Sequence, residues 1–479
     1  MQARAACCSM KKSRIWRISM NIDVIMRDGC RVAAVLLKWA CLLVGLSACV
    51  GSACAVFLWL LDQAAAMRLS HPWLLYGLPV AGMAIGLLYH WFGRMAEGGN
   101  NLIVDQIHQP GGGVPLRMAP LVLVGTVVSH LFGASVGREG TAVQMGGSIA
   151  SAIGRLCSLR DPHEIRILLI SGIAAGFSAV FGTPVAGAVF GMEVLRVGRI
   201  EYGALVPVIL AATMADWVCH AWGIEHVPYI LGFHGYAGLD GRFFHADIIL
   251  LAKVMVAGVA FGLASLLFAK SVHRGAALLR RAWPTPWLRP GIGGVVTIAL
   301  VWICGSRDYL GLGIVAPEDG GASILDFFGP AHYPLAWAWK MVFTVAVLAA
   351  GFKGGEVTPL FFIGAGLGNA LSAWLHAPVD LMAAVGFVAV FAGAANTPLA
   401  CTLMGVELFG AADIVYFATG CFVAYVCSGH SGIYLAQRIA VPKRYAARTL
   451  AGVTLRQARA GYRPDMPATP TLSGEKASS

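Results

Sequence analysis

The sequence contains a glycine-flanked carboxylate between two long apolar runs. Residues 137–141 read Gly-Arg-Glu-Gly-Thr, and the runs cover residues 121–136 and 142–153. An ionisable residue at membrane depth is rare and marks a functional site by default. Backbone N–H groups at a helix start attract anions, so Glu139 can occupy an anion site or yield it to a permeating anion. Protonation would release Glu139 and couple anion to proton movement. The alternative is a structural ion pair with Arg138.

A second copy of this motif follows 217 residues later, where residues 354–358 read Gly-Gly-Glu-Val-Thr. The pattern T-P-x-A-x4-G-x-E also occurs twice, at residues 183–193 and 397–407, with an offset of 214. The two motifs recur in the same order and at nearly the same offset in the sequence, which predicts an internal duplication. Interrupted segments at matching positions in two halves are typical of transporter sites. Glu193 and Glu407 end the second pattern, and we expect them to close a neighbouring backbone break.

The composition predicts an all-α polytopic membrane protein. The 479 residues are 58% hydrophobic and 12% charged, whereas a soluble protein has roughly 25% charged residues. The net charge of +11 gathers in flanks of the apolar part, which favours cytoplasmic termini and does not indicate nucleic-acid binding. The twelve cysteines show no C-x-x-C pair and no Cys/His metal spacing, so no metal ligands and no cofactor are predicted. The basic flanks include Lys11, Lys12, Arg14, Arg17, Lys443, Arg444, Arg448, Arg456 and Arg459.

The apolar segments divide the chain into four parts. We expect a basic cytoplasmic segment over 1–30, a first membrane repeat over 31–245, a second over 246–440 and a cytoplasmic tail over 441–479. Many segments are short and broken by Gly or Pro, which is tolerated at membrane depth only where the backbone is buried in protein or lines an aqueous cavity.

Three local predictions follow from these breaks. Gly-Thr-Pro at 182–184 predicts two helices within the uncharged run 167–192, since Pro suits a first helical turn. Three arginines after the apolar run 254–269 predict a cytoplasmic loop. The last apolar run, 414–437, contains Tyr434, for which an interfacial or core aromatic is the alternative to an anion ligand. The arginines are Arg274, Arg280 and Arg281.

Asn100 and Asn101 lie in a glycine-rich break at 97–101. Their amides could donate to an anion, whereas turn formation is the commoner role of an Asn pair. The sequence alone leaves both interpretations open.

These motifs together resemble the CLC family of anion channels and transporters. Residues 137–141 resemble its G-R-E-G-P gating motif and residues 355–359 its G-x-F-x-P motif. Residues 98–101 lie where the family has G-S-G-I-P, and Tyr434 lies where it has the inner-gate tyrosine. The resemblance covers about residues 33–440 in a consistent order.

The departures from the family pattern are similar to its fluoride-exporting branch. Thr141 replaces Pro, Asn100 replaces the chloride-coordinating Ser, and residues 356–357 replace the usual apolar-Phe pair. Val194 lies where proton-coupled chloride transporters have an inner proton-relay Glu. An amide supplies two N–H donors where Ser supplies one O–H, which suits the small, strongly hydrated fluoride ion.

The resemblance implies a homodimer with one pore per subunit, each subunit built of two inverted repeats with short, tilted and broken helices. It implies a multi-pass protein of a bacterial plasma (inner) membrane that exchanges cytoplasmic fluoride for external protons. Glu139 is then the gating and proton-coupling residue, Arg138 is structural, and Phe362 is a candidate pore-lining aromatic. The implied anion site consists of Asn100, Gly140, Glu356, Val357, Thr358 and Tyr434.

Two other functions compete with fluoride export. One is a chloride/proton antiporter or chloride channel of the same family, against which Glu356 and the altered Ser position argue. The other is an intramembrane enzyme that uses Glu139 and Glu356 as an acid/base pair. No nucleophile or metal constellation accompanies these two glutamates, so we predict that the protein is not an enzyme.

Overall fold

The computed structural model describes residues 2–233, 247–318, 320–443 and 450–460, with side chains described from residue 32 onward. It separates into two units, Met1–Gly45 and Leu46–Ser479. Helix α1 (Gln2–Ser70) runs through both units, so the predicted boundary at residue 30 lies inside a helix. The stretch of α1 from Val32 to Ser70 is long and apolar enough to cross a membrane.

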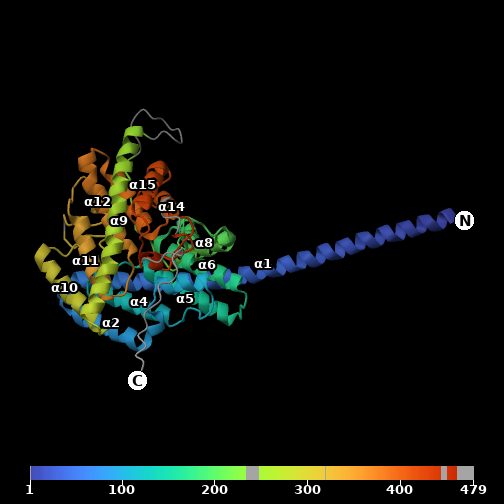
Figure 1. Ribbon diagram of the computed structural model, residues 1–479, viewed down its shortest axis with the longest axis horizontal. Coiled ribbons are helices and arrows are strands. Elements are labelled where there is room, and N and C mark those ends of the chain that lie inside the picture. Colours follow the sequence, from blue (N-terminus) through green and yellow to red (C-terminus); the bar gives the residue numbers. More distant parts are fainter. Residues whose placement is uncertain (1, 234–246, 319, 444–449, 461–479) are drawn as a thin grey trace, which may run out of the picture. The chain divides into compact units, whose positions relative to one another are not determined.

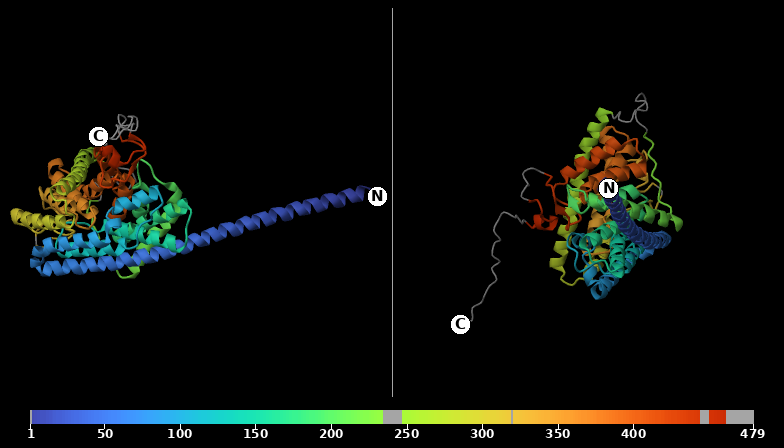
Figure 2. Two further views of the ribbon diagram at one scale, coloured as in Figure 1. Left: turned by 60° about the horizontal axis from the view of Figure 1, so that its bottom comes forward. Right: turned by 90° about the vertical axis from the view of Figure 1, so that its right-hand side faces the viewer.

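The second unit is a bundle of helices in two halves (Figures 1 and 2), drawn from blue to green and from yellow to red. The first half continues with η1 (Pro72–Gly77), α2 (Leu78–Phe92), η2 (Arg94–Ala96), α3 (Asn100–His108), α4 (Met118–Leu131), α5 (Glu139–Leu156), α6 (Pro162–Phe181), α7 (Pro184–Glu193), η3 (Tyr202–Ala204) and α8 (Leu205–Ala221). The second half contains α9 (Ile248–Ala282), α10 (Leu288–Cys304), η4 (Asp326–Phe328), α11 (Ala336–Ala350), α12 (Val357–Leu375), α13 (Val379–Ala395), α14 (Pro398–Phe409), α15 (Ile414–Cys427) and α16 (Leu455–Arg459). A parallel pair of short strands, β1 (Arg196–Val197) and β2 (Arg438–Ile439), joins the two halves.

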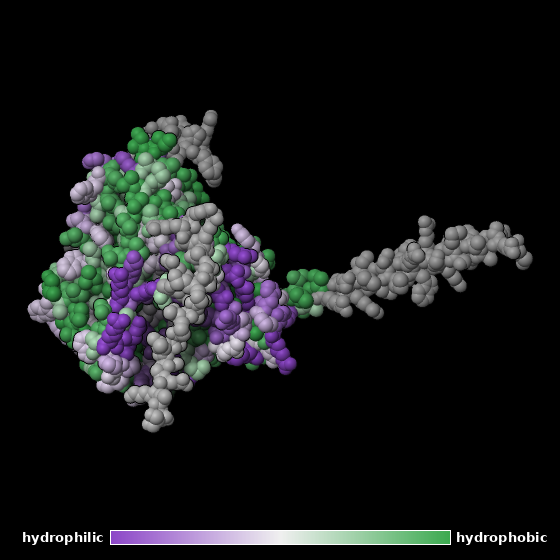
Figure 3. Space-filling view, in the orientation of Figure 1, coloured by the Kyte–Doolittle hydropathy of each residue, from purple (hydrophilic) through white to green (hydrophobic). Residues whose placement is uncertain are grey.

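The bundle contains both long and short apolar helices. Six helical stretches of the described chain are long and apolar enough to cross a membrane, and six further apolar helices are shorter. Figure 3 shows the broad apolar surface that they present, with hydrophilic residues gathered in the lower part of the view. The prediction of an all-α polytopic membrane protein is therefore confirmed. The six long stretches are Val32–Ser70, Pro72–Phe92, Pro162–Phe181, Tyr202–Ala221, Ile248–Ala282 and Val357–Leu375.

Corresponding helix pairs of the two halves pack in the same way. Helix α5 crosses α6 where Gly146 meets Gly172, and a Cβ added to Gly146 would lie 2.0 Å from the Gly172 carbonyl oxygen. Helix α12 crosses α13 where Gly364 meets Gly386, with the equivalent distance again 2.0 Å. Small residues allow such close backbone approach in membrane helices. The matching pairs are 218 and 214 residues apart (364 minus 146, 386 minus 172), which supports the predicted duplication.

Both repeated Thr-Pro segments begin a new helix after a break. Helix α6 ends at Phe181, Gly182 after it is left-handed with φ of 69°, and α7 begins at Pro184. Helix α13 ends at Ala395, Asn396 after it is left-handed with φ of 60°, and α14 begins at Pro398. The prediction of two helices within 167–192 is confirmed. The break at Asn396 likewise divides the run 381–406, which the sequence showed as one apolar segment.

One local prediction is wrong. Arg274, Arg280 and Arg281 lie on α9, which continues to Ala282, because Ala, Leu and Arg sustain a helix beyond the end of the apolar run. The apolar run 414–437 is only partly helical, since α15 ends at Cys427 and residues 428–437, which include Tyr434, are irregular. This irregular segment carries Tyr434 back toward the interior, where its side chain is buried.

Candidate functional site

The carboxylate of Glu139 lies between the N-termini of two helices, one from each half. Glu139 is the first residue of α5 and is 1% exposed. Its Oε2 accepts hydrogen bonds from the backbone N–H of Thr358, on α12, and from that of Arg138, both at 3.1 Å. The Thr358 hydroxyl donates to Oε1. The carboxylate thus occupies the kind of position that favours an anion, the start of a helix with unsatisfied N–H donors.

The glycines of the two motifs hold these helix starts together. Gly137 and Gly355 form an antiparallel bridge with N–H···O distances of 2.6 and 2.7 Å. A Cβ on Gly140 would lie 3.0 Å from the Gly355 Cα and 3.2 Å from the Asn100 Nδ2. Glycine is therefore required here by close approach of three chain segments. The repeated sequence motifs pair with each other directly in space.

A cavity of about 230 Å³ lies beside this bridge. It collects Asn100, Glu356 and Tyr434, three of the predicted anion-site residues. The lining does not include Glu139 or Thr358, whose contact lies beyond it. Tyr89, Gln144 and Lys353 also line the cavity.

The two neighbouring asparagines have different surroundings. Asn101 Oδ1 accepts the backbone N–H of Ala436 at 2.9 Å and so fastens the irregular segment that carries Tyr434. Asn100 begins α3, is 9% exposed, and its Oδ1 has no hydrogen-bond partner among the described residues. Its Nδ2 is the group that approaches Gly140. Asn101 is thus engaged by the backbone, whereas the Asn100 amide is available to the cavity.

The remaining candidates lie around these groups. Glu356 is the residue before α12, and Val357 begins that helix and is buried. Tyr434 is 3% exposed, and its ring meets Phe190 of α7 edge-on at 6.4 Å between centroids. The Nε of Arg138 lies 3.9 Å from Oε1 of Glu139.

Phe362 lies in a buried aromatic cluster on the other side of α12. Its ring meets Phe327 at 4.8 Å and Tyr309 at 6.2 Å between centroids. The Lys340 Nζ lies 5.1 Å from the Phe362 centroid and donates to the carbonyl oxygens of Tyr309 and Gly311. Phe362 is not among the residues that line the cavity of Asn100.

Glu193 and Glu407 form a reciprocal pair of helix caps. The Glu193 carboxylate accepts the N–H groups of Leu399 and Ala400 at the start of α14, at 3.1 and 2.8 Å. The Glu407 carboxylate accepts those of Val185 and Ala186 at the start of α7, at 2.9 and 2.7 Å. Each half caps a helix of the other, which is the contact pattern of a two-fold relation.

A buried amide occupies the neighbourhood of Val194. The Gln437 Nε2 donates to the carbonyl oxygens of Val194 and Ala395, at 2.8 and 2.7 Å, and its Oε1 accepts from Asn396. Sequence reasoning missed this network and also missed Gln144. A polar residue within the otherwise apolar stretch 142–147 was the available signal for Gln144, while nothing local indicated the partner of Gln437.

Lys353 directly precedes the second motif, residues 354–358. Its Nζ lies 4.0 Å from the centroid of the Tyr89 ring, in a cation–π contact. Both residues line the cavity, so the cavity contains a cation, a carboxylate and an amide.

Comparison with known proteins identifies the class of this molecule. A family model described as Voltage gated chloride channel matches residues 81–429. The match covers more than half of the chain, and the protein therefore belongs to this family, whose members are transporters or channels.

Individual relatives agree with this assignment. The "Chloride/fluoride channel protein" of Pseudomonas syringae pv. tomato is 49% identical over 414 residues, covering 85% of this chain and 88% of that protein. The crystal structure of a CLC-type fluoride/proton antiporter is 33% identical with a TM-score of 0.77, covering 84% of this chain and 98% of that one. A slow cyanobacterial Cl⁻/H⁺ antiporter, 21% identical with a TM-score of 0.66, covers 82% and 94% and shares the fold. The CLC-type fold predicted from the sequence is confirmed.

Proposed function

We propose that the protein exports fluoride from the cytoplasm in exchange for external protons. The observation that carries this proposal is the carboxylate of Glu139 held at the start of α12 by the N–H and hydroxyl of Thr358. A protonated Glu139 loses its charge and its preference for this position. A fluoride ion can then accept the same donors, and return of the carboxylate displaces it. Each cycle thereby links one acid–base change to anion movement.

The cavity supports fluoride as the anion. Asn100 offers an amide at a point where an anion arriving at Gly140 would meet N–H donors. Glu356 places a second carboxylate at the cavity, and its negative charge would repel an anion. Binding of an anion there therefore requires strong hydrogen-bond donors. The names of the 49% identical relative and of the 33% identical structure both include fluoride, and they support the same substrate here.

The distribution of basic residues supports an orientation with the cavity open toward the cytoplasm. Val272 of α9 lines the cavity, and the same end of α9 carries Arg274, Arg280 and Arg281. Positive residues flanking membrane helices stay cytoplasmic. We also propose that both termini are cytoplasmic, because basic residues flank the apolar part at both ends of the sequence, and that the membrane is the inner membrane of a bacterium.

We further propose a homodimer in which each subunit has its own pathway, as the CLC resemblance implies. Cross-linking in native membranes would detect the dimer as a species of twice the subunit mass of 50.4 kDa. If only the monomer is detected at every concentration of the cross-linking reagent, this assembly is contradicted.

The decisive experiment is efflux from liposomes loaded with fluoride or chloride, with a pH probe inside. We expect fluoride efflux well above chloride efflux, accompanied by proton uptake that Glu139→Gln abolishes. Chloride efflux equal to or faster than fluoride efflux would instead identify a chloride transporter or channel. Fluoride efflux without proton movement in the wild type would identify a fluoride channel.

A further inference from the structure

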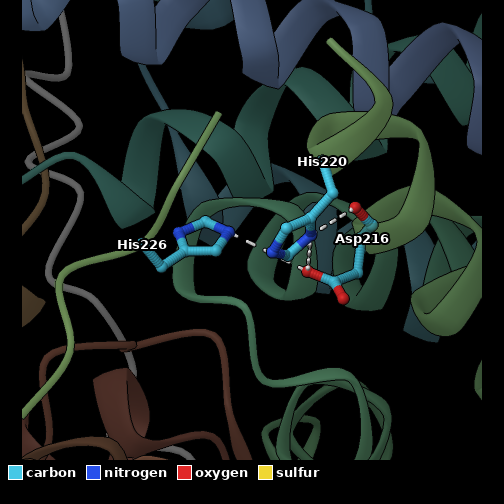
Figure 4. A group of neighbouring side chains, drawn as sticks. All are labelled: Asp216, His220 and His226. Carbon is cyan, nitrogen blue, oxygen red and sulfur yellow. Dashed lines mark hydrogen bonds and ion pairs between the residues drawn. The ribbon is translucent and has the colours of Figure 1, made fainter. Parts of the chain in front are cut away.

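Three potential metal ligands converge where α8 ends. Asp216 and His220 are four residues apart and therefore share one face of α8. His226 follows in the irregular segment after the helix, and its ring packs against Gly182 at the end of α6. Figure 4 shows the two imidazole rings and the carboxylate facing one another, with His226 reaching in from the segment beyond the helix. Sequence reasoning did not single out these residues.

Their spacing is close to that of a tetrahedral metal centre. One ligand atom from each residue lies within 4.8 Å of the other two. The Asp216 Oδ1 is 3.5 Å from Nδ1 of His220 and 3.9 Å from Nε2 of His226. Ligands at the bond lengths of Zn²⁺ stand about 3.4 Å apart in a tetrahedron. The two distances from Asp216 Oδ1 would have to shorten by about 0.1 and 0.5 Å to reach that spacing, and both are too long for hydrogen bonds.

Two of the ligand atoms lack the partners that burial requires. Asp216 Oδ1 and His226 Nε2 are buried and have no hydrogen-bond partner within the described ranges. An unsatisfied buried polar atom costs about 1–3 kcal/mol, and a shared cation would satisfy both at once. The Nδ1 of His220 also lies 3.1 Å from the Asp216 carbonyl oxygen, a contact that a bound cation would replace.

The site is both accessible and chemically selective. The His220 side chain is 49% exposed, so an ion can enter from water and keep a water molecule in the fourth position. Two imidazoles with one carboxylate suit Zn²⁺ and its transition-metal neighbours, whereas Mg²⁺ and Ca²⁺ prefer oxygen ligands.

We propose that Asp216, His220 and His226 bind one divalent transition-metal ion of the Zn²⁺ class. Strand β1 precedes α8 in the chain and pairs with β2, near Tyr434. The proposed site therefore lies at the end of α8 that is farther from this strand pair. Asp216 follows the start of α8 by eleven residues, or about 16 Å of helix. Given the proposed orientation, this is the outer face, and the ion would sit beside Arg138, the neighbour of Glu139.

The test is direct metal binding to the full-length protein in detergent after removal of metals with EDTA. Calorimetric titration with ZnCl₂ should show one equivalent bound by the wild type and by His163→Ala, which removes an exposed histidine elsewhere. His226→Ala and Asp216→Asn should bind at least about 100-fold more weakly, since losing even a partner of a ligand costs 10–100-fold. The melting temperature in EDTA should be the same for all variants. If His226→Ala is destabilised, Asp216→Asn, which preserves the side-chain shape, decides the test.

Cobalt provides a second readout that does not depend on transport. Co²⁺ bound to two imidazoles and a carboxylate should give visible d–d absorption without the sulfur charge-transfer band that exposed Cys41, Cys49 or Cys157 would add. The proposal is overturned if both site variants bind Zn²⁺ as tightly as the wild type, or if the cobalt spectrum shows thiolate ligands. Neither result bears on fluoride transport, so this proposal and the proposed function fail separately.

Discussion

Glutamates contact helix starts across the two halves in two ways. Glu193 and Glu407 form a symmetric pair, in which each carboxylate accepts two backbone N–H groups of the opposite half. Glu139 and Glu356 occupy equivalent positions in the other repeated motif, but only Glu139 reaches across, to Thr358. Glu356 lines the cavity instead.

The difference separates a fixed contact from a movable one. The symmetric carboxylates satisfy donors that have no alternative partner and hold broken helices in register. In the asymmetric pair, one carboxylate lies at a helix start and the other lines a cavity. Protonation of the first carboxylate, or an arriving anion, can therefore displace it from the helix start. We infer that the duplicated fold keeps its symmetry where it needs stability and loses it at the transport site.

The largest expected effect is that of Glu139→Gln. The amide cannot ionise, so proton uptake during fluoride efflux should fall to the background of empty liposomes, while the melting temperature stays within the range of the wild type. Paired recordings with a fluoride electrode and a pH probe measure both fluxes. Proton uptake that persists in this variant would assign coupling to another group and remove the contrast between the two glutamate pairs.

Loss of a symmetric cap should affect stability and leave coupling intact. Glu193→Ala leaves two N–H groups at the start of α14 unpaired, at about 1–3 kcal/mol each, and Glu407→Ala does the same at α7. Thermal or denaturant unfolding in detergent measures the loss, and Glu193→Gln, which retains an acceptor oxygen, should lose less.

Proteoliposome flux provides the control for these cap variants. The fraction that folds should keep the wild-type ratio of fluoride to proton movement. A Glu193→Gln protein that folds normally but moves no protons would show that this pair also takes part in coupling.

An intermediate effect is expected for Thr358→Val, which preserves the backbone N–H and removes the hydroxyl. A hydrogen bond to a charged group contributes about 1.5–3 kcal/mol, and both the Glu139 carboxylate and a fluoride ion in its place would lose this donor. Fluoride efflux, measured with a fluoride electrode, should therefore fall by about 10- to 150-fold. Thr141→Val, which removes a hydroxyl bonded to Thr126 at 2.7 Å, is the matched control and should leave the efflux rate nearly unchanged.

The sequence was sufficient for the parts of the structure that depend on local pattern. The glycine-glutamate repeats and the Thr-Pro repeats predicted paired halves, and Gly182 and Pro184 predicted the break between α6 and α7. Helix length was harder, because the residues that carry α9 past the apolar run to Ala282 also suit a loop.

Contacts between distant segments were beyond sequence reasoning. The partner of Lys353 is Tyr89, and the partners of Gln437 lie at the ends of α7 and α13. The Asp216 cluster joins a helix to the segment that follows it. Such pairs depend on how irregular segments fold back, and no local periodicity encodes that path.

The smallest effect is expected at Asn100, which distinguishes the cavity from the helix start. Asn100→Ser restores a single hydroxyl in place of an amide, so the change in selectivity corresponds to about one neutral hydrogen bond, 0.5–1.5 kcal/mol. Fluoride-over-chloride flux should drop by about 2- to 12-fold, while the ratio of protons to fluoride stays constant because Glu139 still contacts Thr358. Asn101→Ser is the informative control: its partner is the backbone of Ala436, so it should affect stability more than selectivity. Equal loss of selectivity in both variants would mean that the whole glycine-rich segment, rather than one amide, recognises the anion.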